Sequence, residues 1–205
     1  MMTDDTRRYL SDLIARRRPG HSLEQAFYTS REVFEADLRL VPLPHREFLV
    51  AASPPFALTT ALFRRLLGDP AVPLAGAELV VQWGAARWLA SQRPRDAETA
   101  WWAARYQLRL AQPVGRGSFA PPPRADAAWL SVRPRAITAS AHGQRQLRTM
   151  LRRAYRTPRC RAEEVVPGRR RLLIGAAIEP RTPVALVTAE QWHALALLLA
   201  RERRG

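Results

Sequence analysis

Two short apolar runs separated by a helical pattern constrain the fold of this chain most strongly. The first run, Phe48–Ala52, ends at the Ser-Pro-Pro of residues 53–55, which is typical of a buried strand that leads into a tight turn. Residues 59–67 then carry apolar side chains at helical spacing. A second apolar run covers residues 77–83 and leads into the start of another helix. This strand–helix–strand–helix order predicts a parallel α/β sheet.

The middle of the chain predicts two further strands. Residues 106–111 and 127–133 have strand-like patterns, and a loop rich in glycine and proline separates them. Strands joined in this way suggest an antiparallel edge on the sheet. Residues 140–205 show only helical patterns, with an apolar stripe over 147–155 and a Thr-Ala-Glu-Gln capping box at 188–191. We therefore expect the chain to end in helices.

The net charge of +15 points to a polyanionic partner, and nucleic acid is favoured over an anionic membrane or an acidic protein. All 33 basic residues are arginines, and residues 140–205 hold 14 of them against five acidic residues. Guanidinium groups bind phosphate through two parallel hydrogen bonds. We expect RNA contacts from arginines of one predicted helix, and the alternative for them is a solvated face: Arg145, Arg148, Arg152, Arg153 and Arg156.

The remaining composition argues against several classes of site. Cys160 is the only cysteine, so the chain forms no internal disulfide and no four-thiolate metal site, and we expect an inert thiol. The four histidines show no metal-ligand spacing, and no apolar run is long enough to span a bilayer. We expect no metal, no membrane span and a cytoplasmic location. The tryptophan pair at 101–102, with Trp83 and Trp88, is expected to pack inside the protein.

Residues 50–67, Val-Ala-Ala-Ser-Pro-Pro-Phe-Ala-Leu-Thr-Thr and onward, resemble the active-site segment of the rRNA adenine N6-methyltransferases of the erythromycin-resistance and dimethyladenosine transferase type. Three further segments resemble this family in the same order: Leu-Val-Val-Gln at 79–82, Phe-Ala-Pro-Pro-Pro-Arg-Ala-Asp at 119–126, and the segment from 177 to 192. The resemblance covers about residues 37–203. It implies an incomplete Rossmann-like methyltransferase sheet over 37–136 and a small helical, RNA-binding domain over 140–205.

The resemblance implies that the chain transfers a methyl group from S-adenosylmethionine to an exocyclic adenine amine of ribosomal RNA, an activity associated with macrolide resistance. Such chemistry requires a flipped base that is held at its amine and stacked on a ring. By resemblance, the site is the turn Ser53, Pro54, Pro55 and Phe56, in which the Ser53 hydroxyl and the Pro54 carbonyl accept from the amine and Phe56 stacks on the base. The family has asparagine where this chain has Ser53, and Ser-Pro-Pro-Phe also resembles the turn of cytosine N4-methyltransferases.

The donor site is the largest departure from the family. The family holds S-adenosylmethionine with a glycine-rich loop after its first strand, whereas the only Gly-X-Gly here is at 115–117, far downstream of the turn. We therefore expect weak donor binding by this chain, and a non-catalytic, basic RNA-binding remnant is the alternative function. Residues 1–36 form an N-terminal extension with a predicted helix over 6–17. Residues 21–38 resemble the leader of Rieske ring-hydroxylating oxygenases, but one cysteine cannot supply their cluster ligands.

Overall fold

The computed structural model describes residues 43–119, 122–135, 141–166 and 170–201. The chain forms two compact units. We call residues 47–53 with 74–205 the sheet unit and residues 1–46 with 54–73 the turn unit. The helix predicted over 6–17 and the extension over 1–36 lie outside the described residues. The predicted boundary between residues 136 and 140 also falls in an undescribed segment and stays a prediction.

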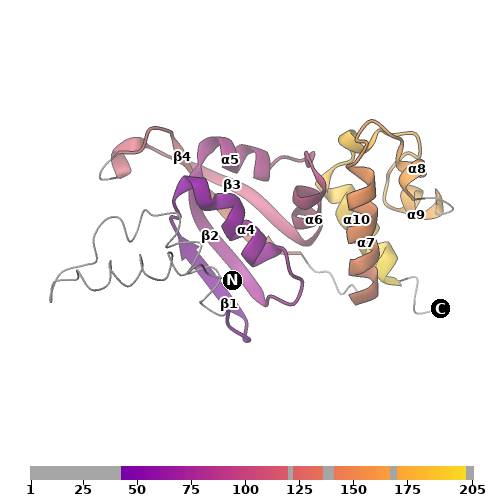
Figure 1. The fold of residues 1–205 in the computed structure, drawn as a ribbon, viewed down its shortest axis with the longest axis horizontal. Coiled ribbons are helices and arrows are strands. Elements are labelled where there is room, and N and C mark those ends of the chain that lie inside the picture. Colours follow the sequence, from indigo (N-terminus) through magenta and orange to yellow (C-terminus); the bar gives the residue numbers. More distant parts are fainter. Residues whose placement is uncertain (1–42, 120–121, 136–140, 167–169, 202–205) are drawn as a thin grey trace, which may run out of the picture. The chain divides into compact units, whose positions relative to one another are not determined.

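The sheet unit contains a four-stranded mixed sheet with the order β1-β2-β4-β3 (Figure 1). Its strands are β1 (Phe48–Ala52), β2 (Leu74–Gln82), β3 (Tyr106–Val114) and β4 (Ala127–Pro134). β1 and β2 pair in parallel, with Val50 opposite Ala77, whereas β4 pairs antiparallel with both β2 and β3. The predicted α/β fold, its parallel pair and its antiparallel edge are therefore confirmed.

β3 is the outer strand of the antiparallel pair, and it has features that are typical of edge strands. Its register shifts between Leu110 and Gln112, and it carries Pro113, which has no amide hydrogen to donate. Bulges and prolines are features that protect exposed edges from pairing with other chains. Only Tyr106, at the start of β3, is buried. β3 therefore runs from the interior of the sheet unit out into solvent.

The core of the sheet unit follows from alternation along its strands. In β2 the side chains of Ala77, Leu79 and Val81 are buried, and the residues between them are partly exposed. α5 (Trp83–Leu89) follows β2 directly and contacts β2, β3 and β4. Burial of apolar surface stabilises such a core by roughly 25 cal/mol for each Å² removed from water.

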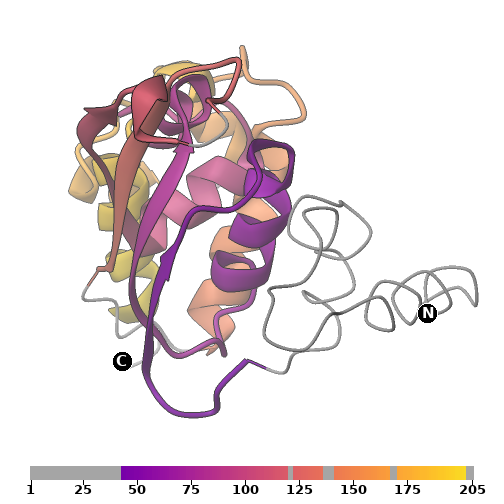
Figure 2. The ribbon, with the colours of Figure 1, turned by 90° about the vertical axis from the view of Figure 1, so that its left-hand side faces the viewer.

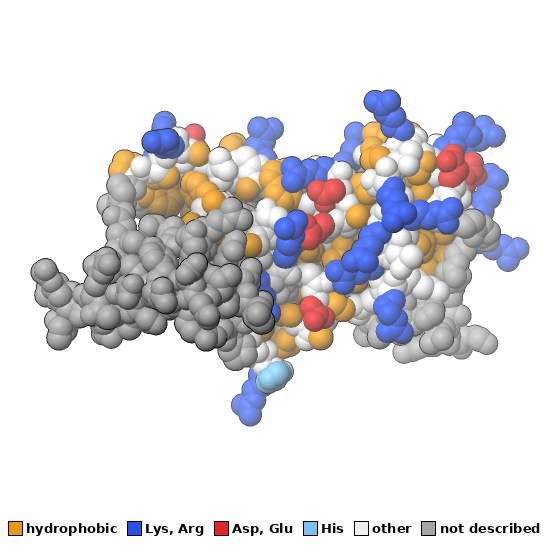
Figure 3. Space-filling model, in the orientation of Figure 1, with side chains coloured by type: hydrophobic (Ala, Val, Ile, Leu, Met, Phe, Trp, Pro, Cys, Tyr) orange, Lys and Arg blue, Asp and Glu red, His pale blue; other side chains and the backbone are white. Residues whose placement is uncertain are grey.

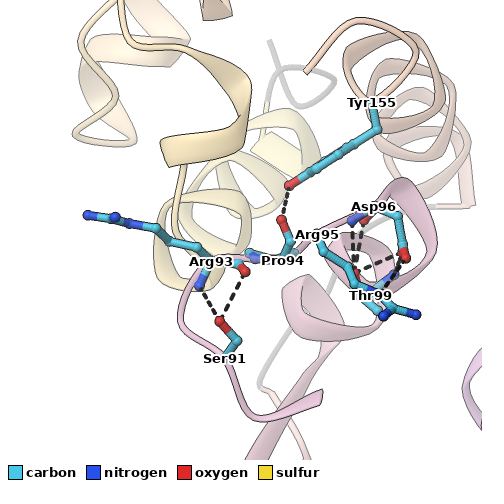
Figure 4. A network of polar contacts seen from close by, with 7 residues as sticks. All are labelled: Ser91, Arg93, Pro94, Arg95, Asp96, Thr99 and Tyr155. Atoms are coloured by element: carbon cyan, nitrogen blue, oxygen red, sulfur yellow. Dashed lines mark hydrogen bonds and ion pairs between the residues drawn. The ribbon is translucent and has the colours of Figure 1, made fainter. Parts of the chain in front are cut away.

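α6 (Ala97–Arg105) was not predicted from the sequence. Residues 99 to 104 are all buried, including Trp101 and Trp102, which confirms that this tryptophan pair packs inside the protein. Asp96 caps the helix: its carboxylate accepts a hydrogen bond from the Thr99 amide at 2.8 Å, and the Thr99 hydroxyl accepts one from the Asp96 amide at 3.2 Å (Figure 4). This reciprocal capping box defines where α6 begins.

The described residues beyond 140 form helices, as predicted. These are α7 (Ala141–Ala154), α8 (Ala162–Val165), α9 (Arg170–Gly175), a 3-10 turn at Val184–Leu186 and α10 (Ala189–Arg201). α6, α7 and α10 pack against one another, and Figure 2 shows the C-terminal helices behind the sheet. The capping box at 188–191 is also confirmed, because the Thr188 amide donates to the Gln191 side chain at 2.9 Å and the Gln191 amide donates to the Thr188 hydroxyl at 3.3 Å.

A set of polar contacts joins these helices to the sheet. The Arg135 guanidinium, just after β4, forms two hydrogen bonds of 2.8 Å with the Glu190 carboxylate at the start of α10. The same group donates to the carbonyl of Ala103 at 2.9 Å. The Tyr155 hydroxyl, after α7, donates to the Pro94 carbonyl at 3.1 Å (Figure 4). The loop before α6, the end of β4 and the C-terminal helices are thus held together by charge-assisted and neutral hydrogen bonds.

The turn unit contributes one single-turn 3-10 helix, η1 (Phe56–Leu58), and the helix α4 (Thr59–Leu67). The predicted helix over 59–67 is confirmed with the same bounds, and Gly68 follows it as the C-terminal cap. In α4, Leu62, Phe63, Leu66 and Leu67 are buried. Residues 43–47 contain no strand.

We predict that the Asp96 cap is needed for full stability. Replacing Asp96 with Ala removes the acceptor for the Thr99 amide and should lower the free energy of unfolding by about 1 kcal/mol. Asp96→Asn keeps an acceptor at this position and serves as the control. Urea denaturation of the three proteins measures the difference, and equal stability of Asp96→Ala and the wild type would show that α6 does not depend on this cap.

Candidate active site and nucleic-acid interface

The first part of the predicted turn provides free hydrogen-bond acceptors. Ser53 follows the carboxyl end of β1 and is exposed, whereas Pro54 is buried. Within the described part of the chain, the Ser53 hydroxyl and the Pro54 carbonyl make no hydrogen bond. Ligands of α/β sheets bind beyond the carboxyl ends of the strands, and this is where Ser53 stands. Within the described part of the chain, no protein donor therefore occupies the two groups that the resemblance assigned to the amine.

In the second part of the turn, Pro55 and Phe56, local hydrogen bonds occupy the backbone carbonyls. The Pro55 carbonyl accepts a hydrogen bond from the Leu58 amide at 2.9 Å. The Phe56 carbonyl accepts from the Thr59 hydroxyl, also at 2.9 Å. The ring of proline restricts its φ, and Pro55, the residue before η1, has a φ of −51°. The backbone that leads into η1 therefore has little conformational freedom. Local structure therefore occupies the carbonyls of Pro55 and Phe56.

Phe56 is half-buried, so its side chain is neither fully enclosed in the core nor fully exposed to solvent. The neighbouring Leu58 is 2% exposed and Thr59 is 3% exposed. Leu58 is therefore the buried residue of η1, and Thr59 is buried in the first turn of α4. A ring that keeps part of its surface in solvent can still offer a face to a planar ligand. Stacking by Phe56 stays a prediction.

The five arginines predicted to bind RNA lie on or just after α7, and all are exposed. Figure 3 shows Arg side chains gathered over the part of the sheet unit that Figure 1 labels α7. The opposite side of this helix carries Leu147, Leu151 and Ala154, which are buried. We call the following residues the α7 arginine face: Arg145, Arg148, Arg152, Arg153 and Arg156.

Carboxylates do not neutralise this face. Within the described residues, none of its five guanidiniums forms an ion pair. Arginines elsewhere in the sheet unit do have acidic partners, such as Arg116 with Asp126 at 3.1 Å and Arg135 with Glu190 at 2.8 Å. Guanidiniums that keep their donors free are suited to bind phosphate oxygens.

The Gly-X-Gly of this sequence does not match the expected donor loop. Gly115 precedes the 3-10 turn Arg116–Ser118 and Gly117 lies within it, on the connection between the antiparallel strands β3 and β4 and not between a parallel strand and a helix. A Cβ atom added to either glycine would meet no atom within 4 Å, so packing within the described protein does not require glycine at either position. Ahead of β1 the sequence contains one glycine, Gly20. We assign no step of methyl transfer to this segment.

The pKa values of three acidic groups outside the turn are shifted by their surroundings. Partial burial alone would raise the pKa of the Glu78 carboxyl, but hydrogen bonds from Trp129, Arg133 and Ser131 lower it below its usual value. The hydrogen bonds from Arg135 lower the pKa of Glu190. Burial raises the pKa of the Cys160 thiol, as expected for an unreactive cysteine.

The described residues contain no cluster of three or more His, Cys, Asp or Glu side chains suited to hold a metal ion. None of their helices combines the length and the apolar character needed to cross a lipid bilayer.

The sequence did not predict that Arg148 contacts a tryptophan. Its guanidinium lies over the Trp101 ring of α6 at 5.6 Å from the centroid, and the Arg105 guanidinium lies near the same ring at 4.9 Å. No local pattern in the sequence joins residues 47 positions apart.

Comparison with known proteins relates the chain to one family. It is 24% identical over 121 residues to rRNA adenine N-6-methyltransferases of Bacillus licheniformis and Bacillus anthracis, which is 59% of this chain and 40% of each relative. It is 34% identical over 102 residues to the rRNA adenine N-6-methyltransferase of Corynebacterium diphtheriae, covering 50% of this chain and 40% of that protein. The chain thus matches less than half the length of these relatives. No family model matches the sequence.

The fold agrees with these relationships. The crystal structure of the 23S rRNA methyltransferase ErmE superimposes with a TM-score of 0.64 over 79% of this chain and 68% of that chain, at 23% sequence identity. At this identity the similarity establishes a shared α/β fold with a mixed sheet and C-terminal helices.

We predict that the chain by itself does not bind S-adenosylmethionine tightly, because it lacks a glycine-rich turn at a strand-to-helix junction. Isothermal titration calorimetry of the full chain should show no saturable heat at micromolar donor concentration. A dissociation constant in the micromolar range would mean that residues outside such a turn hold the donor.

Proposed function

We propose that this chain, which is homologous over about half of its length to the rRNA adenine N6-methyltransferases, is the RNA-binding and base-holding part of such an enzyme. The observation that carries the proposal is the pair of free acceptors, the Ser53 hydroxyl and the Pro54 carbonyl, at the carboxyl end of the parallel strand β1. Free acceptors at this place suit the amine of a target base.

The turn would act by holding a base that has left its stack. An exocyclic amine has two N–H donors, so one can bond to the Ser53 hydroxyl and the other to the Pro54 carbonyl. Phe56 then supplies a ring face, and stacking of a base on an aromatic side chain is worth about 1–3 kcal/mol. Both acceptors would orient the amine nitrogen, which is the atom that N6-methylation modifies.

The α7 arginine face would supply most of the affinity for ribosomal RNA. Its guanidiniums are exposed and form no ion pairs within the described part of the chain. Binding of Arg to phosphate releases counterions and is independent of base sequence. In this proposal the α7 arginine face binds the RNA backbone and the turn holds the target adenine.

The second candidate is a non-catalytic RNA-binding protein. The specific observation that favours it is the position of the Gly-X-Gly of residues 115–117, which lies on the connection between the antiparallel strands β3 and β4. In that case the α7 arginine face would bind RNA as proposed, whereas the turn would have no base to hold. The two candidates therefore differ at Phe56 and agree on α7.

We predict that the α7 arginine face determines the salt dependence of RNA binding. Replacing Arg148, Arg152 and Arg156 together with Gln should weaken binding and flatten the log–log plot of affinity against salt, by about 0.7 for each lost contact with single-stranded RNA. Fluorescence anisotropy at several salt concentrations measures both quantities. Unchanged affinity in the triple variant would mean that these arginines are only solvated.

We predict that Phe56 serves base binding more than folding. Phe56→Ala should leave the melting temperature and the affinity for general RNA close to wild type, because phosphate contacts lie elsewhere. It should abolish the change in emission that wild-type protein causes in RNA containing the adenine analogue 2-aminopurine.

Leu58→Ala is the matched control for this prediction, because Leu58 is 2% exposed in the same 3-10 turn. A buried Leu→Ala change costs about 2–5 kcal/mol of stability, so this variant should melt earlier. If Phe56→Ala melts as early as Leu58→Ala, then Phe56 is a core residue and the base-holding role is lost. An unchanged 2-aminopurine signal in a stable Phe56→Ala protein would favour the non-catalytic candidate.

A further inference from the structure

We propose that a pocket at the start of β3 binds a single nucleotide, free or as part of an RNA strand, with Arg109 holding its phosphate and Glu190 accepting from an amino group of its base. All residues that line this pocket belong to the sheet unit. None of them is part of the turn at 53–56 or of the α7 arginine face, so the inference goes beyond the proposed function.

The pocket lies at the opposite end of the sheet from Ser53. β1 and β2 are parallel, and Ser53 follows the carboxyl end of β1. β4 is antiparallel to β2, and β3 is antiparallel to β4, so β3 runs in the same direction as β1 and β2. The start of β3 therefore lies at the amino end of the parallel strands. A nucleotide in the pocket would not compete with a base held by Ser53.

The size and the walls of the pocket suit one small organic ligand. Its volume is about 280 Å³, close to the lower end of the range of about 300–1,000 Å³ that small-molecule sites have. Leu89, Ala103 and Tyr106 line it and are buried, so they provide an apolar wall. Gln107, Arg109 and Glu190 add polar groups to the lining. An apolar wall with a few polar groups can cover a sugar or base and fix its orientation.

Arg109 supplies the positive charge of the pocket. Its side chain is exposed, and within the described residues its guanidinium forms no hydrogen bond and no ion pair. The other guanidinium of the pocket, that of Arg135, is paired with Glu190 at 2.8 Å. The pocket therefore has one positive charge in excess, which disfavours a cation and which a phosphate group would balance through charge-assisted hydrogen bonds.

Glu190 supplies an acceptor that stays accessible. Each of its carboxylate oxygens accepts one hydrogen bond of 2.8 Å from Arg135, and a carboxylate can accept about four in all. The Glu190 side chain is 70% exposed, so a ligand can reach the remaining acceptor positions. Hydrogen bonds from Arg135 are the main cause that lowers the pKa of Glu190, and the charge of Arg109 adds to this effect. Glu190 is thus ionised and can only accept, which fits an amino group and repels a carbonyl oxygen.

The charge of Arg109 acts on Glu190, so the anion-binding group and the acceptor belong to one site. Phosphate alone would leave the apolar wall and the Glu190 acceptor unused, and a neutral nucleoside would leave the Arg109 charge unpaired. A nucleotide whose base carries an amino group uses all three features. The pocket therefore selects for a phosphate and an amino group on the same molecule.

Isothermal titration calorimetry of the full chain with three probes tests both contacts. Adenosine 5′-monophosphate has the phosphate and the amino group, adenosine lacks the phosphate, and inosine 5′-monophosphate has a carbonyl oxygen in place of the amino group. We expect adenosine 5′-monophosphate to bind saturably. Each of the other two probes should bind at least about tenfold more weakly, because each loses a hydrogen bond to a charged group.

Arg109→Gln tests the phosphate contact separately. This variant should bind adenosine 5′-monophosphate about as weakly as the wild type binds adenosine, and its affinity for adenosine should be unchanged. Arg87→Gln is the matched control, because Arg87 is an exposed arginine of the same unit that does not line the pocket. The melting temperature of each variant shows whether it is folded, and the comparison of the three probes on the wild type does not depend on any variant.

A single-stranded RNA oligonucleotide distinguishes the two sources of the nucleotide. If the pocket takes a nucleotide of RNA, the oligonucleotide displaces adenosine 5′-monophosphate, and Arg109→Gln weakens RNA binding more than Arg87→Gln does. If the pocket takes a free nucleotide, adenosine 5′-monophosphate stays bound in the presence of RNA. Arg109→Gln and Arg87→Gln then bind RNA equally.

The pocket is overturned as a nucleotide site by any of three results. These are no binding of adenosine 5′-monophosphate to the wild type, equal binding of inosine 5′-monophosphate, or equal binding of adenosine 5′-monophosphate to folded Arg109→Gln and Arg87→Gln. Phe56→Ala separates the pocket from the proposed function, because nucleotide binding in the pocket should persist in this variant. A wild-type chain that binds adenosine 5′-monophosphate through Arg109 but binds no RNA would overturn the proposed function and leave the pocket as a site for a free nucleotide.

Discussion

The central position of β2 decides the arrangement of the whole sheet unit. β2 pairs in parallel with β1 on one side and antiparallel with β4 on the other. Because β4 occupies the place beside β2, the chain must first run along the edge as β3 and then return. That return brings Arg135 next to the start of β3, where its amide bonds to the Arg105 carbonyl at 2.8 Å. The helices after residue 140 therefore start beside α6, and this is why Arg148 can reach Trp101.

The sequence predicts most of the secondary structure because most elements bury one side only. Apolar runs identified β1 and β2, and helical spacing and a capping-box pattern identified α4 and the start of α10. The expectation that β1 is a buried strand is wrong, because its residues are partly or fully exposed and Leu49 is 75% exposed. α6 was missed for a physical reason. Its residues from Thr99 to Ala104 are all buried, so the helix has little polar face and no amphipathic pattern to detect. The one local sequence feature that marks the start of α6 is the capping box formed by Asp96 and Thr99.

The candidate site was predictable in its residue types but not in its contacts. The turn at 53–56 could be recognised because its residues follow one another. Which of its carbonyls stay free depends on η1, where Leu58 and Thr59 bond back to Pro55 and Phe56 and leave Pro54 unused. The contact of Arg148 with Trp101 depends on the packing of α6 against α7, two helices that the β3–β4 hairpin separates along the chain. Tertiary contacts of this kind leave no local pattern in a single sequence.

In the proposed function, affinity and selectivity for RNA come from different parts of this chain. The guanidiniums of the α7 arginine face would bind phosphate, which is the same at every nucleotide, so they would contribute affinity without distinguishing one base from another. Trp101 is 3% exposed, so its ring offers no open face on which a base could stack. Selection of a base would therefore depend on the turn, in which the Pro54 carbonyl can only accept a hydrogen bond whereas the Ser53 hydroxyl can also donate one. A uracil carbonyl oxygen placed against the Pro54 carbonyl would set two acceptors against each other, and that repulsion, more than the stacking on Phe56, would exclude uracil.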